Sequence, residues 1–254
     1  KNNMNDINLI FKQTDLGYFC LIEKDLIGNS IQNQGVWEPH LHYFYSQFIK
    51  PNFTVVDGGA NIGFHSVQFA KLANEGKTYC FEPQPLIFNV LSTNILFNGL
   101  TDIVEQCKLG LGDKKDNLKM SPLEKQVFNP NCINWGGRGL TDSEEGEEEV
   151  QTITLDSLNL PKLDFIKLDV QGFEYKAFIG GEGTIKSNNP IIFLENYPTS
   201  EEDQKTLGLL EDWGYITYRL LCTQYQEDCI LLNPEKHKEE IKIIENQTQY
   251  KWKK

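Results

Sequence analysis

The sequence has no long hydrophobic run and no excess of positive charge. Apolar stretches such as IIFL at 191–194 are far shorter than the roughly 20 residues that a membrane-spanning helix needs. The 36 Asp and Glu residues outnumber the 24 Lys and Arg residues and give a net charge of −12. Because proteins bind nucleic acid through clustered Lys and Arg, this charge argues against a nucleic-acid partner. We therefore expect neither a membrane span nor binding to nucleic acid.

Closely paired cysteines are also absent. The six cysteines are spread over 254 residues without a CxxC motif, which excludes a disulfide scaffold and favours free thiols in a reducing compartment. No basic segment followed by an apolar one opens the chain, so no signal peptide is indicated and we expect a cytoplasmic protein. The first residue is Lys rather than Met, from which we expect a domain of a longer polypeptide.

Short apolar runs typical of buried strands alternate along the chain with segments that have the apolar period of a helix, and this alternation predicts an α/β fold. Strands are expected near residues 54–57, 77–81, 103–109, 163–170 and 191–195, with helices between most of them. Short connections between strand and helix indicate βαβ units, and hence a mostly parallel sheet with helices on both faces. Two further strands, near 215–222 and 228–232, are separated by about five residues. Such a connection is too short for a crossover, so the sheet should end in an antiparallel pair.

Three parts are predicted along the chain. Residues 1–50 should form an N-terminal hairpin and helix, residues 51–234 the main domain, and residues 235–254 a C-terminal helix or tail. Inside the main domain, residues 112–150 show no regular period and are interpreted as an irregular insertion. We expect a partly ordered lid over 128–140 and a solvated loop for the acidic run that follows it.

A glycine-rich segment directly follows the first strand of the main domain. In VVDGGANIGF the strand leads through glycines into a helix, which lets the backbone approach a ligand closely at the helix N-terminus. The spacing also fits a weak GxAxxG dinucleotide fingerprint. However, Asp57 ends the strand, where its carboxylate would repel a pyrophosphate and suit an ammonium or sulfonium group, as in S-adenosylmethionine. The residues assigned to this cofactor loop are Asp57, Gly58, Gly59, Ala60, Asn61 and Gly63.

A second acidic residue closes the next strand. Glu82 follows Gly59 by 23 residues and precedes Pro83, the placement in which a carboxylate accepts hydrogen bonds from two ribose hydroxyls. NAD and S-adenosylmethionine both contain such a ribose, so Glu82 indicates a nucleoside cofactor without choosing between them. We also assign Leu109, at the end of the third strand, to the cofactor pocket.

A third group of charged residues lies in and after the segment LDFIKLDVQGFE. Strand alternation places Lys167 and Asp169 on one face of the strand. In a buried strand the Lys167 ammonium must either pair with an anionic group or extend into a cavity. In a doubly wound sheet, Asp169 would face the glycine loop across the switch point, where ligands bind. Glu174 in the next helix and Glu195 at the end of the following strand add two carboxylates. A purely structural Lys167–Asp169 ion pair is the alternative.

The motifs DGGANIGFHS, FEP, TNILFNGL, TLDSL, FIKLDVQGFE and IIFLEN, in this order, resemble the FkbM-type family of class I S-adenosylmethionine-dependent O-methyltransferases. The resemblance covers residues 36–232. It implies a Rossmann-like sheet of seven strands with an antiparallel last strand, and methyl transfer to a hydroxyl, often of a sugar or polyketide. It also implies that the segment Trp37-Glu38-Pro39 closes over the cofactor and that the pair Gly136-Gly137 lines the acceptor cleft. Gln171 departs from the family pattern, which more often has Glu there.

For such a reaction the protein must align donor and acceptor and remove the hydroxyl proton. We expect Asp169 to act as the base or to orient the acceptor, with Glu195 and Glu174 as the next candidates. Lys167 would keep a carboxylate ionised or stabilise a developing alkoxide. His65, in the first turn of the loop helix, is a rival base, although packing against the sheet is the stronger interpretation.

The main hypothesis is therefore an S-adenosylmethionine-dependent O-methyltransferase that acts on a hydroxyl of a sugar, glycan or small natural product. A cofactor-binding module without turnover and an NAD-dependent oxidoreductase are the alternatives. The clustered carboxylates with His65 would also permit a divalent metal. No spaced set of ligands in the sequence supports one, so no metal-binding residue is assigned.

Overall fold

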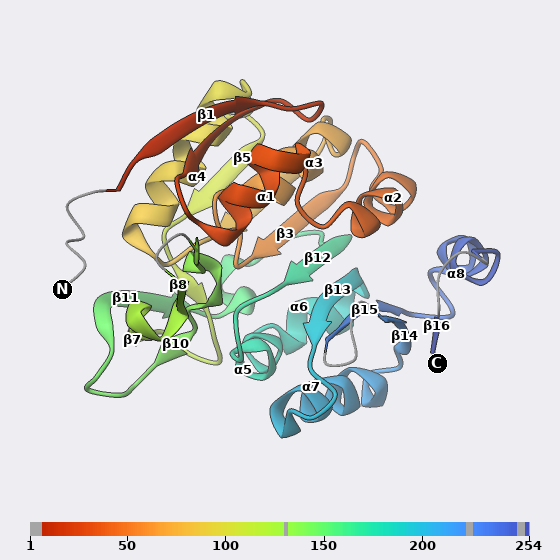
Figure 1. Cartoon of the computed structure of the whole chain (residues 1–254). Helices are drawn as coiled ribbons and strands as arrows, with labels where there is room; N and C mark the ends of the chain where they lie inside the picture. The colour runs from red at the N-terminus through yellow and green to blue at the C-terminus, as the bar shows by residue number, and fades with distance from the viewer. Residues whose placement is uncertain (1–6, 130–131, 222–225, 248–251, 254) are drawn as a thin grey trace.

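A mostly parallel sheet runs through the middle of the molecule in the computed structural model, which describes residues 7–129, 132–221, 226–247 and 252–253 (Figure 1). Its strands, in spatial order, are β16 (Trp252–Lys253), β14 (Ile216–Leu221), β15 (Glu227–Leu232), β13 (Ile191–Asn196), β12 (Phe165–Leu168), β3 (Thr54–Gly58), β4 (Lys77–Phe81) and β5 (Val104–Cys107). The five strands from β13 to β5 are parallel to one another. β15 is antiparallel to both of its neighbours, β13 and β14.

The strand arrangement confirms the expected Rossmann-like α/β fold with its antiparallel pair of last strands. Leu221 and Glu227 lie opposite each other in the β14–β15 register, as the short connection requires. The structure adds one strand to the seven that were expected, because β16 pairs antiparallel with the outer edge of β14.

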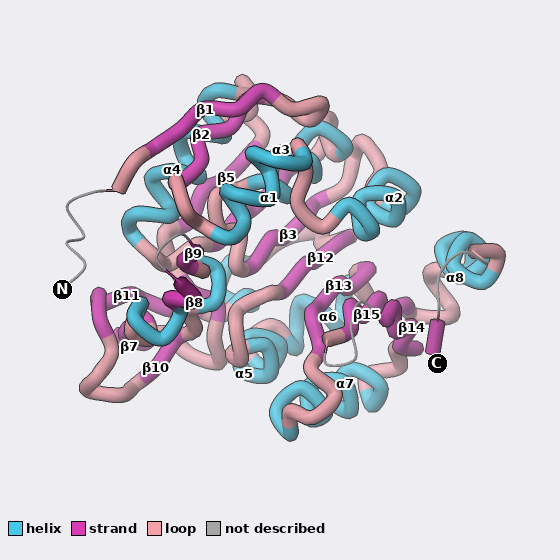
Figure 2. The backbone as a smooth tube through the Cα atoms, in the orientation of Figure 1, coloured by secondary structure: helices cyan, strands magenta, loops and turns pink. Residues whose placement is uncertain are grey.

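Helices cover both faces of this sheet, as expected for buried parallel strands (Figure 2). On one face, α2 (Pro39–Phe48) and α3 (Phe64–Leu72) pack their aromatic side chains against Phe165 and Phe193. On the other face, Ile166 and Leu168 contact the helices α5 (Glu174–Ile179), α6 (Glu182–Asn188) and α7 (Glu201–Asp212). Alternate residues of β12 thus face opposite layers, which places Lys167 on the α2–α3 side.

The expected N-terminal hairpin is confirmed: β1 (Leu9–Gln13) pairs antiparallel with β2 (Tyr18–Ile22). It packs on α4 (Pro85–Phe97), where the Asn94 side chain accepts a hydrogen bond from Cys20 N at 2.6 Å and donates one to Cys20 O at 3.1 Å. The sequence reading missed a further helix, α1 (Leu26–Gln34), which begins at the buried cap residue Asp25. The division of the chain at residues 50 and 234 stays a prediction.

The insertion is more regular than predicted. The strands β6 (Gly110–Leu111), β7 (Asp116–Met120), β10 (Leu140–Thr141) and β11 (Glu147–Ile153) form a second sheet, and β8 (Val127–Asn129) pairs with β9 (Cys132–Ile133). The prediction of a solvated acidic loop was wrong at its C-terminal end, because Glu147 and Glu148 belong to β11 and pair with Arg138. Buried Val150 and Thr152 anchor the same strand. Residues 130–131 of the expected lid lie outside the described residues.

The remaining predictions need smaller changes. The helical stretch expected near 174–187 is divided into α5 and α6 at Gly180, where a Cβ atom would lie only 1.9 Å from Gly112 O. The C-terminal segment contains α8 (Lys238–Glu245). The described cysteines are free thiols, and Cys222 lies outside the described residues. Within the described part of the chain, no helix is long and apolar enough to cross a membrane.

Candidate active site

A cavity of about 300 Å³ lies at the carboxyl ends of β3, β4, β12 and β13, the edge at which open α/β sheets bind ligands. Most of the predicted site residues line it together: Glu38, Asp57, Gly59, Ala60, Asn61, His65, Glu82, Pro83, Leu109, Lys167, Asp169 and Glu195. The other three, Gly58, Gly63 and Glu174, are not among the described residues that line it. The structure thus brings five separate sequence motifs to one place.

The glycine loop is held against the strand that carries Asp169. Gly59 has φ +77°, which side chains rarely adopt, and a Cβ atom on it would lie 1.8 Å from Asp169 O. The amides of Gly59 and Ala60 both donate to Phe81 O, at 3.0 and 2.9 Å. Only glycine at position 59 therefore allows β3 and β12 to approach each other so closely at the cavity floor.

Gly58 and Gly63 lie behind the cavity wall. A Cβ atom on Gly58 would meet the Leu168 side chain at 2.4 Å, and Gly63 is the residue at which α3 begins. Both glycines therefore shape the loop, and their contact with the cofactor stays a prediction.

Glu82 presents a fixed carboxylate at the end of β4. It is buried, and its two oxygens accept hydrogen bonds from Asn61 N at 3.0 Å and Gln84 N at 2.9 Å. Burial raises the pKa of Glu82 to about 7. Each carboxylate oxygen keeps one lone-pair direction beyond these amides, so the residue can accept two hydroxyl donors. This arrangement fits a ribose diol.

Asp57 contributes a buried carboxylate that is only partly satisfied. Its Oδ2 accepts a hydrogen bond from Ser66 Oγ at 2.5 Å, while Oδ1 has no hydrogen-bond partner among the described residues. Burial raises the pKa of this carboxyl group. A buried, unpaired carboxylate oxygen beside a cavity favours a ligand that brings a positive charge or a donor. The residues present therefore fit a nucleoside cofactor with a cationic group.

Lys167 and Asp169 form the central charged pair of the site. Lys167 Nζ lies 3.2 Å from Asp169 Oδ2, and Gln171 Nε2 donates to the other oxygen, Oδ1, at 2.6 Å. Burial alone would lower the pKa of Lys167, but the carboxylates of Asp169, Glu38 and Asp57 raise it, so Lys167 is charged. The pair is an ion pair that also lines the cavity, and its catalytic role stays a prediction. Gln171 serves here as an orienting donor.

Glu38 closes the site from the N-terminal side. It precedes α2 with φ +48°, and its Oε2 lies 2.8 Å from His65 Nε2. Burial opposes ionisation, but the hydrogen bond and charge of His65 and the charge of Lys167 lower the pKa of Glu38 to about 2. His65 is itself buried, and its Nδ1 has no partner within the described part of the chain. Its Nε2 is engaged by Glu38, which supports a structural role for this histidine.

Glu195 lies at the rim with Tyr197 and Gln226 as partners. Tyr197 Oη donates to its Oε2 at 3.1 Å, and Gln226 Nε2 contacts its Oε1. Burial, followed by the nearby carboxylates of Asp169 and Glu38, raises the pKa of Glu195 to about 8. Glu195 is therefore protonated near neutral pH and can donate a hydrogen bond to an acceptor molecule.

Glu174 has a different position from the one expected. Its carboxylate accepts hydrogen bonds from Val170 N and Gly172 N, each at 2.9 Å. It therefore supports the loop that follows Asp169 instead of facing the cavity.

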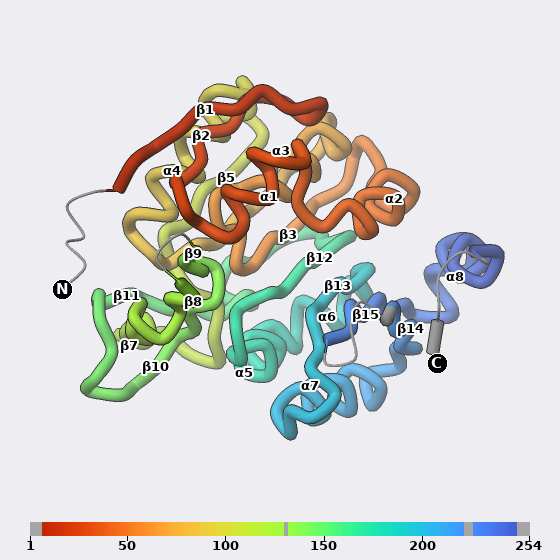
Figure 3. The backbone as a smooth tube through the Cα atoms, viewed as in Figure 1, coloured from red at the N-terminus to blue at the C-terminus, as the bar shows by residue number. Residues whose placement is uncertain are grey.

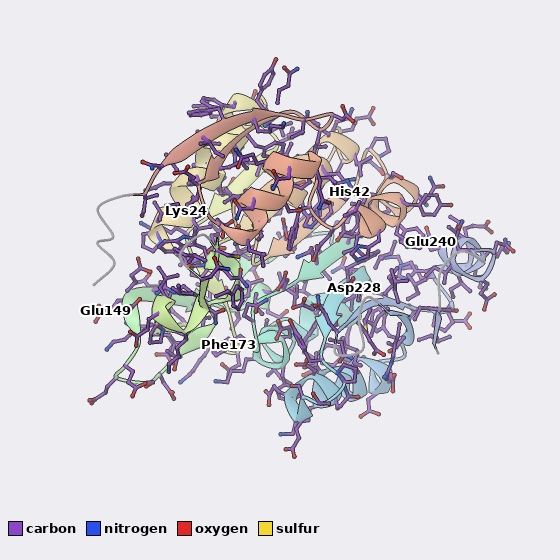
Figure 4. The ribbon with its side chains drawn as sticks, viewed as in Figure 1. Lys24, His42, Glu149, Phe173, Asp228 and Glu240 are labelled. Carbon is purple, nitrogen blue, oxygen red and sulfur yellow. The ribbon has the colours of Figure 1, made fainter. Side chains whose placement is uncertain are left out.

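The sequence reading missed several lining residues. His40 Nε2 lies 2.6 Å from Asp228 Oδ2 at the rim, and Figure 4 labels Asp228 on β15. Gln84 and Arg138 also line the cavity. The sequence could have pointed to Arg138, because it is the one arginine in the insertion and lies between a glycine cluster and an acidic run. Trp37 and Gly136 line the cavity, whereas Gly137 is not among the described residues that line it. The assignment of Gly136-Gly137 to the acceptor cleft stays a prediction.

No cluster of three or more His, Cys, Asp or Glu side chains in the described part of the chain could hold a metal ion. The carboxylates of the site are instead paired with Lys167, His65, His40 and backbone amides.

Comparisons with known proteins find methyltransferases among both the similar sequences and the similar structures. The chain is 24% identical over 194 residues to Methyltransferase sdnD from Sordaria araneosa, covering 66% of this chain and 75% of that protein. It is 29% identical over 140 residues to Hexuronic acid methyltransferase AglP from Haloferax volcanii, covering 54% and 53% of the two chains. The crystal structure of Methyltransferase FkbM from Methylobacillus flagellatus KT shares the fold, with a TM-score of 0.52 and 16% identity over 77% of this chain and 50% of that one.

This chain spans about half the length of the archaeal relative and of the Methylobacillus structure. A family model described as the Methyltransferase FkbM domain matches residues 57–217. The match begins at the aspartate that ends β3 and includes Glu82 and the Lys167–Asp169 pair. Since it covers well over half of the sequence, the chain belongs to the FkbM methyltransferase family.

Proposed function

We propose that this protein is an S-adenosylmethionine-dependent O-methyltransferase that acts on a hydroxyl of a sugar, glycan or small natural product. The observation that carries the proposal is the arrangement of three carboxylates around one cavity: Glu82, Asp57 and Asp169. Glu82 can accept the ribose hydroxyls of the cofactor, and the unpaired Asp57 oxygen suits its positive charge. Asp169 follows β12, the strand next to β3, and lines the same cavity, so it can meet an acceptor bound beside the cofactor.

S-adenosylmethionine supplies an activated methyl group, so the protein needs only to align the acceptor and manage one proton. Asp169 is placed to accept that proton, because Lys167 and Gln171 fix its two oxygens. Lys167, whose ammonium lies 3.2 Å from Asp169 Oδ2, is placed to stabilise negative charge on the acceptor oxygen. Protonated Glu195, which Tyr197 orients, offers a hydrogen-bond donor to a further hydroxyl of the acceptor.

A sugar-like acceptor is supported by two observations. The rim offers many hydrogen-bonding side chains, and one relative is named a hexuronic acid methyltransferase. The NAD-dependent alternative is disfavoured by Asp57, whose carboxylate at the glycine loop would repel a pyrophosphate. The module without turnover is disfavoured by the Lys167–Asp169 pair in the cavity lining, which cofactor binding alone would not require.

Isothermal titration with S-adenosylmethionine and S-adenosylhomocysteine tests the cofactor. Wild type should bind both, and Glu82→Ala should weaken binding at least about tenfold, or about 1.4 kcal/mol. Glu75→Ala, which removes an exposed glutamate at the opposite end of β4 from Glu82, is the control and should bind as wild type does. Absence of binding to wild type, or binding of NAD in its place, would overturn the proposal.

A screen of sugars with labelled S-adenosylmethionine then tests turnover. Methylated product that is stable to mild alkali indicates an ether and hence a hydroxyl acceptor, whereas an alkali-labile product indicates an ester on a carboxylate. Cofactor binding with no product from any acceptor would favour the module without turnover.

A further inference from the structure

The insertion reaches the nucleoside end of the cavity. The turn Trp135–Gly137 lies over the glycine loop, because a Cβ atom on Gly136 would be 3.0 Å from Asn61 Nδ2. The same segment is attached to the N-terminal part of the chain, since Ile133 N donates to Lys24 O at 2.9 Å. Figure 3 shows the green insertion beside the red N-terminal segment at this point. The insertion thus forms one wall of the cofactor pocket.

Arg138 is part of this wall and is held in place by the insertion. Its side chain is only 1% exposed, and its nitrogens lie 2.6 Å from Glu148 Oε2 and 3.2 Å from Glu147 Oε2. A third hydrogen bond, from Nε to Ser121 O, is 2.7 Å long. These partners all belong to the insertion, so the guanidinium position is fixed by the small second sheet.

Gln84 connects this guanidinium to the ribose-binding carboxylate. Arg138 Nη1 donates to Gln84 Oε1 at 3.3 Å, and Gln84 Nε2 donates to Trp135 O at 3.2 Å. The backbone amide of the same Gln84 donates to Glu82 Oε1 at 2.9 Å. A continuous chain of hydrogen bonds therefore runs from the acidic strand β11 through Arg138 and Gln84 to Glu82.

We propose that Arg138 is a cofactor-positioning residue, which acts through Gln84 to hold the Glu82 carboxylate in the orientation that accepts the ribose hydroxyls. This inference rests on the proposed function, because it presumes a ribose at Glu82. It assigns part of the cofactor site to the insertion, 54 residues beyond Gln84. The proposal also gives a role to the glutamates at the start of β11, which supply the anionic partners that fix Arg138 in a buried position.

The test compares two ligands that differ only at the ribose: S-adenosylhomocysteine and its 2′,3′-dideoxy analogue. Wild type should bind the parent compound at least about tenfold more tightly, because the dideoxy analogue cannot make the hydrogen bonds from the ribose hydroxyls to the Glu82 carboxylate. Arg138→Met should bind the parent about tenfold more weakly, and its preference should shrink to about threefold or less. A general loss of folding would not change this ratio selectively.

Lys125→Met is the matched control. It removes an ion pair of the same insertion with the acidic run, Lys125 Nζ to Glu145 Oε2 at 3.3 Å, but that pair is exposed and remote from Gln84. It should keep the wild-type ribose preference. If Arg138→Met also keeps the wild-type preference, the inference is overturned while the proposed function stands.

A second variant covers the case in which Arg138→Met does not fold. Gln84→Met keeps the backbone amide that bonds Glu82 but removes the side chain that Arg138 and Trp135 hold. It should lose the ribose preference as well, and retention of the full preference would overturn the inference. If wild type binds neither S-adenosylmethionine nor S-adenosylhomocysteine, the proposed function has failed. That result can be told apart from retention of the ribose preference by Arg138→Met or Gln84→Met, which overturns only the inference about Arg138.

Discussion

The ammonium of Lys167 lies 3.2 Å from the carboxylate of Asp169, two residues further along the same strand end. The spacing of two places both side chains on one face of β12. That face points toward α2 and α3 and into the cavity, so the pair is sheltered from solvent but open to a ligand. An ion pair in this position can be both a structural element and the chemical centre of the site.

Replacing Asp169 with Asn should therefore separate chemistry from cofactor binding. We expect kcat to fall by about 10²–10⁴-fold, the usual contribution of a positioned general base, while the Kd for S-adenosylhomocysteine changes less than about threefold. Steady-state kinetics and titration calorimetry give the two quantities. Asp212→Asn, at an exposed position on α7, should leave both unchanged. An Asp169→Asn enzyme with kcat near that of wild type would exclude Asp169 as the base.

Glu174→Gln should have a weaker effect, because Glu174 supports the loop after Asp169 and does not line the cavity. An amide can still accept from one of the two backbone N–H groups, so about one hydrogen bond, worth roughly 1 kcal/mol, is lost. We expect thermal stability to fall and kcat to drop only about tenfold. A loss of kcat as large as that of Asp169→Asn would instead place Glu174 in the reaction itself.

Gly59 and Gly35 provide a matched pair for the glycine loop, since both have φ +77°. Gly35→Ala meets no atom within 4 Å, so it should cost only the conformational penalty of about 1–2 kcal/mol. Gly59→Ala adds the collision with Asp169 O and should cost at least about 2 kcal/mol more. Urea unfolding curves measure both. Equal destabilisation by the two variants would show that β3 and β12 can separate without penalty.

The raised pKa of Glu195 predicts a pH-dependent stability. An unfolded glutamate titrates near 4.5, whereas burial and the nearby carboxylates raise the pKa of folded Glu195 to about 8. The folded state therefore holds more protons across this range, so the contribution of Glu195 is fully present below pH 4.5 and is lost as pH rises through 8. Glu195→Gln removes this loss.

The stability of Glu195→Gln relative to wild type should thus increase between pH 5 and pH 8, by roughly 3 kcal/mol. Denaturant unfolding at the two pH values measures the change. Glu201→Gln, an exposed position in the first turn of α7, should show no such trend. A constant difference between Glu195→Gln and wild type across the range would mean that Glu195 ionises normally in the folded protein.

The main sheet could be predicted because its strands are short apolar runs that end at informative residues. Asp57, Glu82 and Asp169 each close a strand, and parallel strands bring such ends together without further information. The small second sheet could not be predicted in this way. β6 and β10 contain two residues each, which is too short for a periodic signal, and β11 begins with three consecutive glutamates.

Contacts between distant residues account for the rest of what the sequence reading missed. His40 and Asp228 meet across 188 residues, and Gln84 and Arg138 across 54. No local spacing encodes either contact. Glu174 shows a different limit of prediction from sequence. Its place in the first turn of a helix was predicted correctly, but the direction in which its carboxylate points depends on the left-handed turn at Gln171 and Gly172.

In the main sheet β15 lies between β13 and β14, although it follows both in the sequence. This position affects the order in which the strands can pair as the chain is synthesised. During synthesis β14 emerges before the strand on which it pairs, so it cannot join the sheet when it first appears. The outer edge of β13 stays unpaired until residue 232 has been made. An exposed edge of apolar residues favours pairing with other chains. A chain that ended before Glu227 would keep the glycine loop and every carboxylate from Asp57 to Glu195, yet it would leave that edge open and aggregate.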